Sequence, residues 1–159
     1  MDKRALIRQI IAQLDAELAL SAQSARTAHA EATDEQSKAE NKYDTRGLEA
    51  SYLAHGQSVK AAETSQARQQ FAELDISPFR KDEPIDLGAL VTLQGDDGEE
   101  VYFLGPRAGG IEVELGKKSV LVITPHSPFG RQLMGRKTGD AVEIELARAR
   151  RSLRIVAVE

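Results

Sequence analysis

Hydrophobic positions near the start of the chain recur at alternating spacings of three and four residues. This stripe is typical of an amphipathic helix that packs against a partner, and its members are Ile7, Ile11, Leu14, Leu18, Ser21, Ala25, Ala28 and Ala32. A second helical segment is predicted from about residues 37–40 to Leu74. It ends there because Pro78 follows closely, and proline disfavours helix in the residue before it.

The two helices are predicted to pair within one chain as an antiparallel hairpin. Residues that face each other across such a hairpin have numbers with a constant sum. Four candidate pairs share the sum 77: Leu6 with Phe71, Leu18 with Val59, Ala25 with Tyr52, and His29 with Leu48. In this register Tyr52 is expected to be buried in the space beside Ala25. A parallel dimeric coiled coil is the alternative, and the constant sum favours the hairpin.

The fold-back of the hairpin is predicted near Ser37 and Lys38, within an acidic segment. Its carboxylates are Glu31, Asp34, Glu35, Glu40, Asp44 and Glu49. One interpretation is that they solvate an exposed turn and form salt bridges with Lys38, Lys42 and Arg46. The other is that they act chemically at the tip of the hairpin, and the residues of this segment alone leave both interpretations open.

The pattern changes near residue 76, after which all the prolines and most glycines occur. Short apolar segments with intervening turn residues are typical of strands, and those predicted here are 87–93, 100–104, 111–115, 119–123, 141–146 and 152–158. The first two are predicted to form a hairpin, because Asp97-Gly98 in the segment between them can supply positive φ. Ser127-Pro128 predicts the start of one short helix, and Gly135 predicts its end. The fold class is therefore α+β, with a helical hairpin at 1–76 and a β-rich domain with one short helix at 77–159.

The composition is that of a soluble protein and argues against several other classes. The chain is 41% hydrophobic and 29% charged, as in soluble folded proteins. It has no cysteine, which excludes disulfides and thiolate zinc sites, and no run that predicts a signal peptide or a membrane span. We therefore expect a cytoplasmic protein. A net charge of −4 argues against general affinity for duplex DNA.

An arginine cluster near the C-terminus has two interpretations. Its members are Arg148, Arg150, Arg151 and Arg154. Alternation along an edge strand would place them in solvent, which we favour, whereas a basic surface could also bind an acidic partner.

Three motifs in the second half resemble a known family. Segments 121–125, 127–136 and 139–142 are similar to the C-terminal domain of the GreA/GreB transcript cleavage factors of bacterial RNA polymerase. The residues that fit the family signature are Ser127, Pro128, Arg131, Leu133, Gly135, Gly139 and Asp140. The resemblance implies an FKBP-like C-terminal domain that uses these residues to dock on the rim of the polymerase secondary channel. It also implies that the antiparallel coiled-coil hairpin reaches down that channel.

The tip departs from the family pattern, which is an Asp, two intervening residues, and then Glu-Asn. Glu40-Asn41 matches the second half, but Ser37 stands at the Asp position. Asp34 and Glu35 are the candidates to replace the missing carboxylate. Such carboxylates suit Mg²⁺, which prefers oxygen ligands and can generate a nucleophile for phosphodiester cleavage. We expect no stably bound cofactor, only Mg²⁺ shared with the polymerase.

The resemblance implies an elongation factor with no active site of its own, which stimulates the polymerase to cleave backtracked RNA. The expected partners are RNA polymerase and, indirectly, nascent RNA, and we expect a monomer with no membrane contact. One alternative is a channel-binding modulator or inhibitor without cleavage activity. Another is an FKBP-type prolyl isomerase with a coiled-coil dimerisation arm, which is disfavoured because four Phe, three Tyr and no Trp supply few cleft aromatics.

Overall fold

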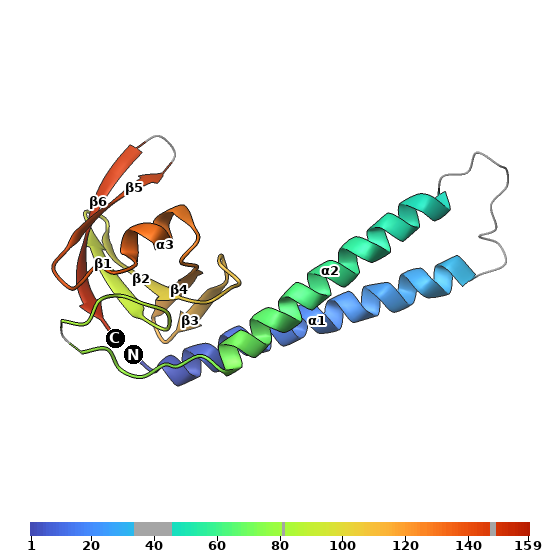
Figure 1. Ribbon diagram of the computed structural model, residues 1–159, viewed down its shortest axis with the longest axis horizontal. Helices are drawn as coiled ribbons and strands as arrows, with labels where there is room; N and C mark the ends of the chain where they lie inside the picture. Colours follow the sequence, from blue (N-terminus) through green and yellow to red (C-terminus); the bar gives the residue numbers. More distant parts are fainter. Residues whose placement is uncertain (34–45, 81, 147–148) are drawn as a thin grey trace. The chain divides into compact units, whose positions relative to one another are not determined.

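The computed structural model describes residues 1–33, 46–80, 82–146 and 149–159. Two long helices are followed by a sheet with one short helix, so the predicted α+β class is confirmed (Figure 1). The helices are α1 (Lys3–Thr33), α2 (Arg46–Ala72) and α3 (Pro128–Leu133). The strands are β1 (Leu90–Gly95), β2 (Gly98–Leu104), β3 (Glu112–Leu115), β4 (Lys118–Ile123), β5 (Ala141–Leu146) and β6 (Ala149–Val158). Within these described ranges, no helix is long and apolar enough to cross a membrane.

The chain forms two compact units. One, here called the sheet unit, contains residues 1–11 and 69–159, and the other, the hairpin unit, contains residues 12–68. The sheet unit thus includes the first turns of α1 and the last residues of α2. The predicted division at residue 76 separates helices from strands in the sequence, whereas the sheet unit also contains residues 1–11 and 69–76.

In the hairpin unit, α1 and α2 run side by side in opposite directions (Figure 1). The Lys60 Nζ lies 2.9 Å from the Glu17 Oε1, and the numbers of these two residues have the predicted sum of 77. A second ion pair joins the Arg68 Nε to the Asp15 Oδ1 at 2.5 Å. The predicted antiparallel hairpin is therefore confirmed.

Two residues predicted to pack inside the hairpin lie on its surface instead. Tyr52 is 72% exposed and Val59 is 46% exposed, so the prediction that Tyr52 fills the space beside Ala25 was wrong. The residues of α2 that are partly or fully buried in this unit include Gln57, Ala61 and Thr64. Tyr52 and Val59 are seven residues apart, which places them together on a different face of the helix.

The strands form one mixed sheet in the order β3-β4-β2-β1-β6-β5. The predicted β1–β2 hairpin is present, with Gly95 paired to Gly98 and a turn at residues 96–97. Gly98 has a φ of +121°, which side chains disfavour. One pairing was not predicted: β2 and β4 are parallel, with Val101 beside Val120, and β3 lies outside β4 at the sheet edge.

The sheet is buried on both faces. One face packs around Leu133 of α3, and its buried cluster is Ile85, Ala89, Val91, Leu93, Tyr102, Leu104, Ile123, Leu133, Val142, Leu153 and Ile155. On the other face Phe103 stacks against Phe71 of α2, with ring centroids 6.5 Å apart. A Cβ at Gly105 would lie 2.8 Å from the Phe71 ring, so glycine leaves the space that this ring fills. The end of α2 that carries Phe71 is therefore part of the sheet unit's core.

Candidate functional site

The motif that suggested the family surrounds α3, and Ser127 starts this helix. The Ser127 Oγ accepts a hydrogen bond from the Gly130 N–H at 2.9 Å and donates one to the Thr124 carbonyl oxygen at 2.8 Å. Pro128 occupies the first turn, where its missing N–H is not needed. The predicted helix start is confirmed, and Ser127 orients the loop that leads into α3.

Leu133 and Gly135 fix the other end of α3 to the sheet. Leu133 is fully buried, so its side chain has no surface to offer a partner in this conformation. Gly135 has a φ of +77°, and its N–H donates to the Ile85 carbonyl oxygen at 2.8 Å. In return, the Ile85 N–H donates to the Arg136 carbonyl oxygen at 2.7 Å. These two motif residues shape the backbone on which the surface residues stand.

Asp140 organises the turn after α3. Its Oδ2 accepts from the Lys137 N–H at 2.9 Å, and its carbonyl oxygen accepts from the Ile155 N–H at 2.9 Å. The preceding Gly139 has a φ of +98° and donates its N–H to the Ile155 carbonyl oxygen at 2.8 Å. Asp140 therefore holds the loop between α3 and β5 against β6.

Arg131 is the motif residue whose charged side chain lies exposed on α3. Its Nη1 donates to the His126 carbonyl oxygen at 2.7 Å. Other exposed residues surround it and define what we call the α3 surface: His126, Pro128, Arg131, Gln132, Arg136 and Lys137. With three cationic side chains, this surface suits an acidic partner. Arg136 and Lys137 were missed in the sequence, where their only signal is that they directly follow the helix.

An aromatic contact joins α3 to the sheet. Phe129 of α3 packs edge-on against Tyr102 of β2, with ring centroids 5.0 Å apart. Burial, together with the neighbouring Glu100 carboxylate, raises the pKa of the Tyr102 hydroxyl. The hydroxyl donates to the Glu100 Oε2 at 2.6 Å and stays protonated near neutral pH. Phe129 is itself half-buried, so α3 presents a mixed basic and apolar face.

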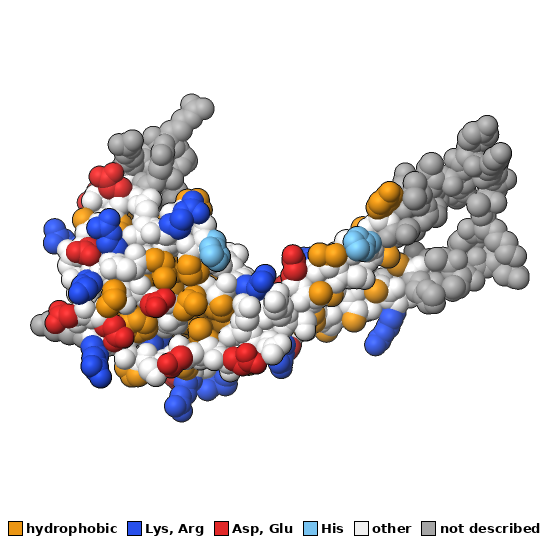
Figure 2. All heavy atoms as spheres, viewed as in Figure 1, with side chains coloured by type: hydrophobic (Ala, Val, Ile, Leu, Met, Phe, Trp, Pro, Cys, Tyr) orange, Lys and Arg blue, Asp and Glu red, His pale blue; other side chains and the backbone are white. Residues whose placement is uncertain are grey.

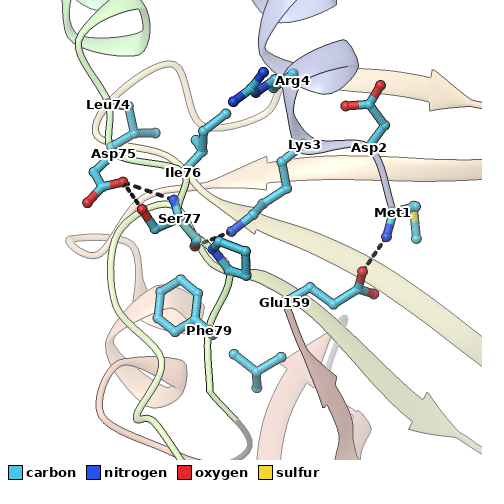
Figure 3. A pocket seen from close by; sticks show the side chains of 12 residues that line it. Met1, Asp2, Lys3, Arg4, Leu74, Asp75, Ile76, Ser77, Phe79 and Glu159 are labelled. Carbon is cyan, nitrogen blue, oxygen red and sulfur yellow. Dashed lines mark hydrogen bonds and ion pairs between the residues drawn. The ribbon is translucent and has the colours of Figure 1, made fainter.

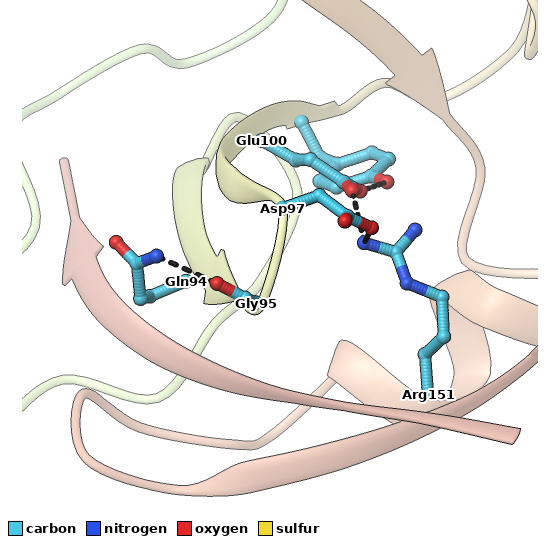
Figure 4. Close-up of polar contacts among 6 residues, drawn as sticks. Gln94, Gly95, Asp97, Glu100 and Arg151 are labelled. Atoms are coloured by element: carbon cyan, nitrogen blue, oxygen red, sulfur yellow. Dashed lines mark hydrogen bonds and ion pairs between the residues drawn. The ribbon is translucent and has the colours of Figure 1, made fainter.

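The arginine side chains near the C-terminus do not all lie free in solvent. Arg151 lies on β6, where its Nη2 is 3.0 Å from both the Asp97 Oδ2 and the Glu100 Oε1 (Figure 4). The edge-strand interpretation was wrong at Arg154, because β6 pairs there with both β1 and β5, whereas at Arg150 and Arg151 it pairs with β5. Arg154 is exposed, and the side chains of Arg148 and Arg150 lie outside the described residues.

A pocket of about 670 Å³ lies in the sheet unit beside the N-terminus (Figure 3). Lys3 is 8% exposed, and its Nζ donates to the carbonyl oxygens of Ser77 at 2.9 Å and Gly88 at 3.2 Å. Burial lowers the pKa of the Lys3 ammonium, opposed in part by the Glu159 and Asp75 carboxylates. Ser77 hydrogen bonds lower the pKa of Asp75, and Glu159 pairs with the Met1 amine. Because these charges already serve internal contacts, we assign the pocket a structural role.

The residues predicted to assist a metal lie outside the described part of the chain. Asp34, Glu35 and Glu40, like Ser37, belong to the segment 34–45. The magnesium prediction therefore stays a prediction. Among the residues that are described, no cluster of three or more His, Asp or Glu side chains is suited to hold a metal ion.

Comparison with known proteins identifies the relatives of this chain. A family model described as "Transcription elongation factor, GreA/GreB, C-term" matches residues 80–159. Transcription elongation factor GreA of Streptococcus pneumoniae serotype 4 is 34% identical over 92 residues, which cover 57% of this chain and 54% of that protein. The match thus spans about half the length of such curated relatives.

Solved structures of similar proteins cover more of the chain at lower identity. GreA factor homolog 1 (Gfh1) of Thermus thermophilus is 21% identical, with a TM-score of 0.40, and the match covers 96% of this chain and 94% of that one. Transcription elongation factor GreA/GreB from Nitrosomonas europaea is 19% identical, with a TM-score of 0.38, and the match covers 74% and 94% of the two chains. The family assignment depends on the sequence match, which spans half of the chain and includes the whole α3 motif. This chain therefore belongs to the GreA/GreB family of transcription elongation factors.

Proposed function

We propose that this protein binds RNA polymerase, inserts its helical hairpin into the secondary channel, and stimulates the polymerase to cleave backtracked RNA. The observation that carries the proposal is the family match over residues 80–159, preceded in the same chain by an antiparallel helical hairpin. In this proposal residues 77–159 dock and residues 1–76 insert. The protein acts as a monomer without an active site of its own.

The α3 surface is the proposed docking site. Arg131, Arg136 and Lys137 are exposed there and offer positive charge to an acidic polymerase surface. Pro128 adds an exposed apolar contact. The other motif residues, Leu133 among them, support docking by holding α3 in place.

The tip carboxylates are the proposed effector groups. Glu40, helped by Asp34 or Glu35, presents oxygen atoms to the polymerase active site and to RNA near it. Mg²⁺ shared with the polymerase would supply a positioned hydroxide for cleavage of the phosphodiester. The proposed contribution of this chain is the negative charge of these carboxylates.

A cleavage assay on backtracked polymerase complexes, combined with pull-down by core polymerase, tests both steps. Glu40→Ala should abolish stimulated cleavage and leave binding unchanged, because a tip carboxylate contributes little to docking elsewhere. Ser37→Asp should raise the cleavage rate, since it restores two carboxylates about one helical turn apart. Arg131→Ala should weaken binding several-fold and lower cleavage only through occupancy.

Ser37 also favours a second candidate function, in which the protein occupies the channel and modulates transcription without cleavage. In that case the wild type gives no stimulated cleavage, Glu40→Ala changes nothing, and Ser37→Asp creates activity. Failure of the wild type to bind core polymerase at all would contradict both candidates.

A further inference from the structure

An open apolar groove of about 670 Å³ runs between α1 and α2 in the hairpin unit. Its lining includes Leu18, Ser21, Ala22 and Ala25 from α1, and Leu53 and Ala61 from α2. Leu53 is 63% exposed, and none of the described residues that line the groove is charged. Figure 2 shows hydrophobic side chains gathered along these helices. Exposed apolar surface of this kind is typical of an interaction site.

We propose that this groove binds the same groove of a second copy of the chain. The two α1 helices lie antiparallel across a two-fold axis between Ser21 and Ala22. This arrangement places Leu18 opposite Ala25 of the second copy, and Ser21 opposite Ala22. The intrachain hairpin stays intact in each copy. Because neither copy has to unfold, we propose a reversible association.

The size of the lining residues supports this pairing. Leu18 and Leu53 both line the groove but do not face each other across the hairpin. In the antiparallel pairing of α1 and α2 they lie toward opposite ends of the groove. The same two-fold axis brings Leu53 opposite Ser58 of the second copy, since facing residues within one chain have numbers that sum to 77. A large side chain therefore meets a small one on both helices, which gives the close packing that a symmetric interface requires.

The charges beside the groove also fit a second copy. The proposed register brings Glu17 opposite Arg26 of the second copy, and both residues are at least partly exposed. The described side chains of the hairpin unit comprise three acidic residues (Asp15, Glu17 and Glu63) and three basic residues (Arg26, Lys60 and Arg68). The described side chains of the hairpin unit therefore carry no net charge that would oppose the association. A nucleic acid would instead select a positively charged surface.

The association limits activity if the proposed function holds, since a hairpin covered by a second copy cannot also enter a channel. The association itself does not require the proposed function. Its test uses the purified full chain without polymerase, so the two proposals fail separately.

Sedimentation equilibrium over a several-hundred-fold concentration range provides the main test. The weight-average mass should rise from 17.3 kDa toward twice that value. Leu53→Glu should weaken the association by at least about tenfold, since it places a charge in the apolar interface. Leu20→Glu is the matched control, because Leu20 is 65% exposed and lies outside the groove, and it should change the association by less than about twofold. Circular dichroism verifies that both variants keep their helix content.

Disulfide crosslinking tests the register, and the absence of cysteine from the chain makes single-cysteine variants clean reporters. Ala22→Cys should form a covalent dimer in mild oxidant, because it lies at the two-fold axis. Ser24→Cys, an exposed position that does not line the groove, should not. The proposal is overturned if the mass stays at 17.3 kDa throughout, if Leu20→Glu acts as strongly as Leu53→Glu, or if Ser24→Cys crosslinks equally well. A strictly monomeric protein whose polymerase binding is weakened by Leu53→Glu would assign the groove to the polymerase instead.

Discussion

Lys3 shows how one charged side chain can be built into a core. It continues the buried stripe of Leu6, Ile7 and Ile10 along α1, yet it ends in an ammonium group. Its two carbonyl partners, from Ser77 and Gly88, belong to the chain that leads from α2 into β1. The ammonium also lies 5.1 Å from the centre of the Phe79 ring. Lys3 therefore joins the start of α1 to the segment that follows the hairpin.

Replacing Lys3 by methionine tests this role. Lys3→Met keeps the aliphatic stem but leaves the buried Gly88 carbonyl oxygen and the part-buried Ser77 carbonyl oxygen without their donor, so it should lower the free energy of unfolding by about 1–3 kcal/mol. The same substitution at the neighbouring, exposed Arg4 should cost less than about 0.5 kcal/mol. Urea denaturation of both variants provides the measurement. Equal losses at the two positions would show that the carbonyl contacts of Lys3 add little.

At the scale of elements, two helical glycines illustrate opposite constraints. Gly130 lies in α3, where a Cβ would meet the Thr124 carbonyl oxygen at 1.9 Å. Gly56 lies in α2, where a Cβ would have no neighbour within 4 Å. Glycine is thus required at position 130, because a Cβ there would clash with the backbone of the loop that precedes α3. It is dispensable at position 56, because a Cβ there would meet no neighbour.

Alanine at these two glycines should change stability in opposite directions. Gly130→Ala should destabilise the protein by about 1–3 kcal/mol, since the clash involves backbone that cannot move aside cheaply. Gly56→Ala should stabilise it by about 0.5–1 kcal/mol, because alanine has the higher helix propensity and the methyl group fits. Thermal unfolding followed by circular dichroism measures both. Stabilisation by Gly130→Ala would mean that the loop before α3 adjusts freely.

For the whole molecule, the pairing of the two helices within one chain is the feature on which the proposed function depends. The sheet unit includes the start of α1 and the end of α2, and Phe71 from that end packs on Phe103 of the sheet. The start of α1 and the end of α2 therefore belong to one compact unit with the sheet. A parallel dimer would have to separate these segments.

Spin labels at Arg8 and Gln69 test the pairing in solution. Both side chains are exposed, they lie on opposite helices of the sheet unit, and their numbers have the sum of 77. The helix axes should be about 10 Å apart, so the labels should be close to each other. Pulsed electron-spin measurements are made on a doubly labelled chain diluted with excess unlabelled protein, which removes signals between copies. Label separations of several tens of ångströms would contradict the intrachain hairpin.

The sequence by itself determined the elements and the family. The stripe of α1, the hairpin turn at residues 96–97 and the Ser127-Pro128 helix start all depend on neighbours only a few residues away. Helical periodicity, turn residues and caps act over that range, so these features were predictable. The α3 motif gave the resemblance to the GreA/GreB family, which the match over residues 80–159 confirmed.

Only the tertiary structure decided which faces are buried and which strands are neighbours. The parallel pairing of β2 with β4, the exposure of Tyr52 and the interior position of β6 all depend on contacts between distant residues. A shift in register or strand order changes these contacts while leaving the local pattern intact. Burial also separated Leu133, which holds α3 in place, from Arg131, which lies on the surface. Both fit the same motif, and their different environments follow from packing that no short segment encodes.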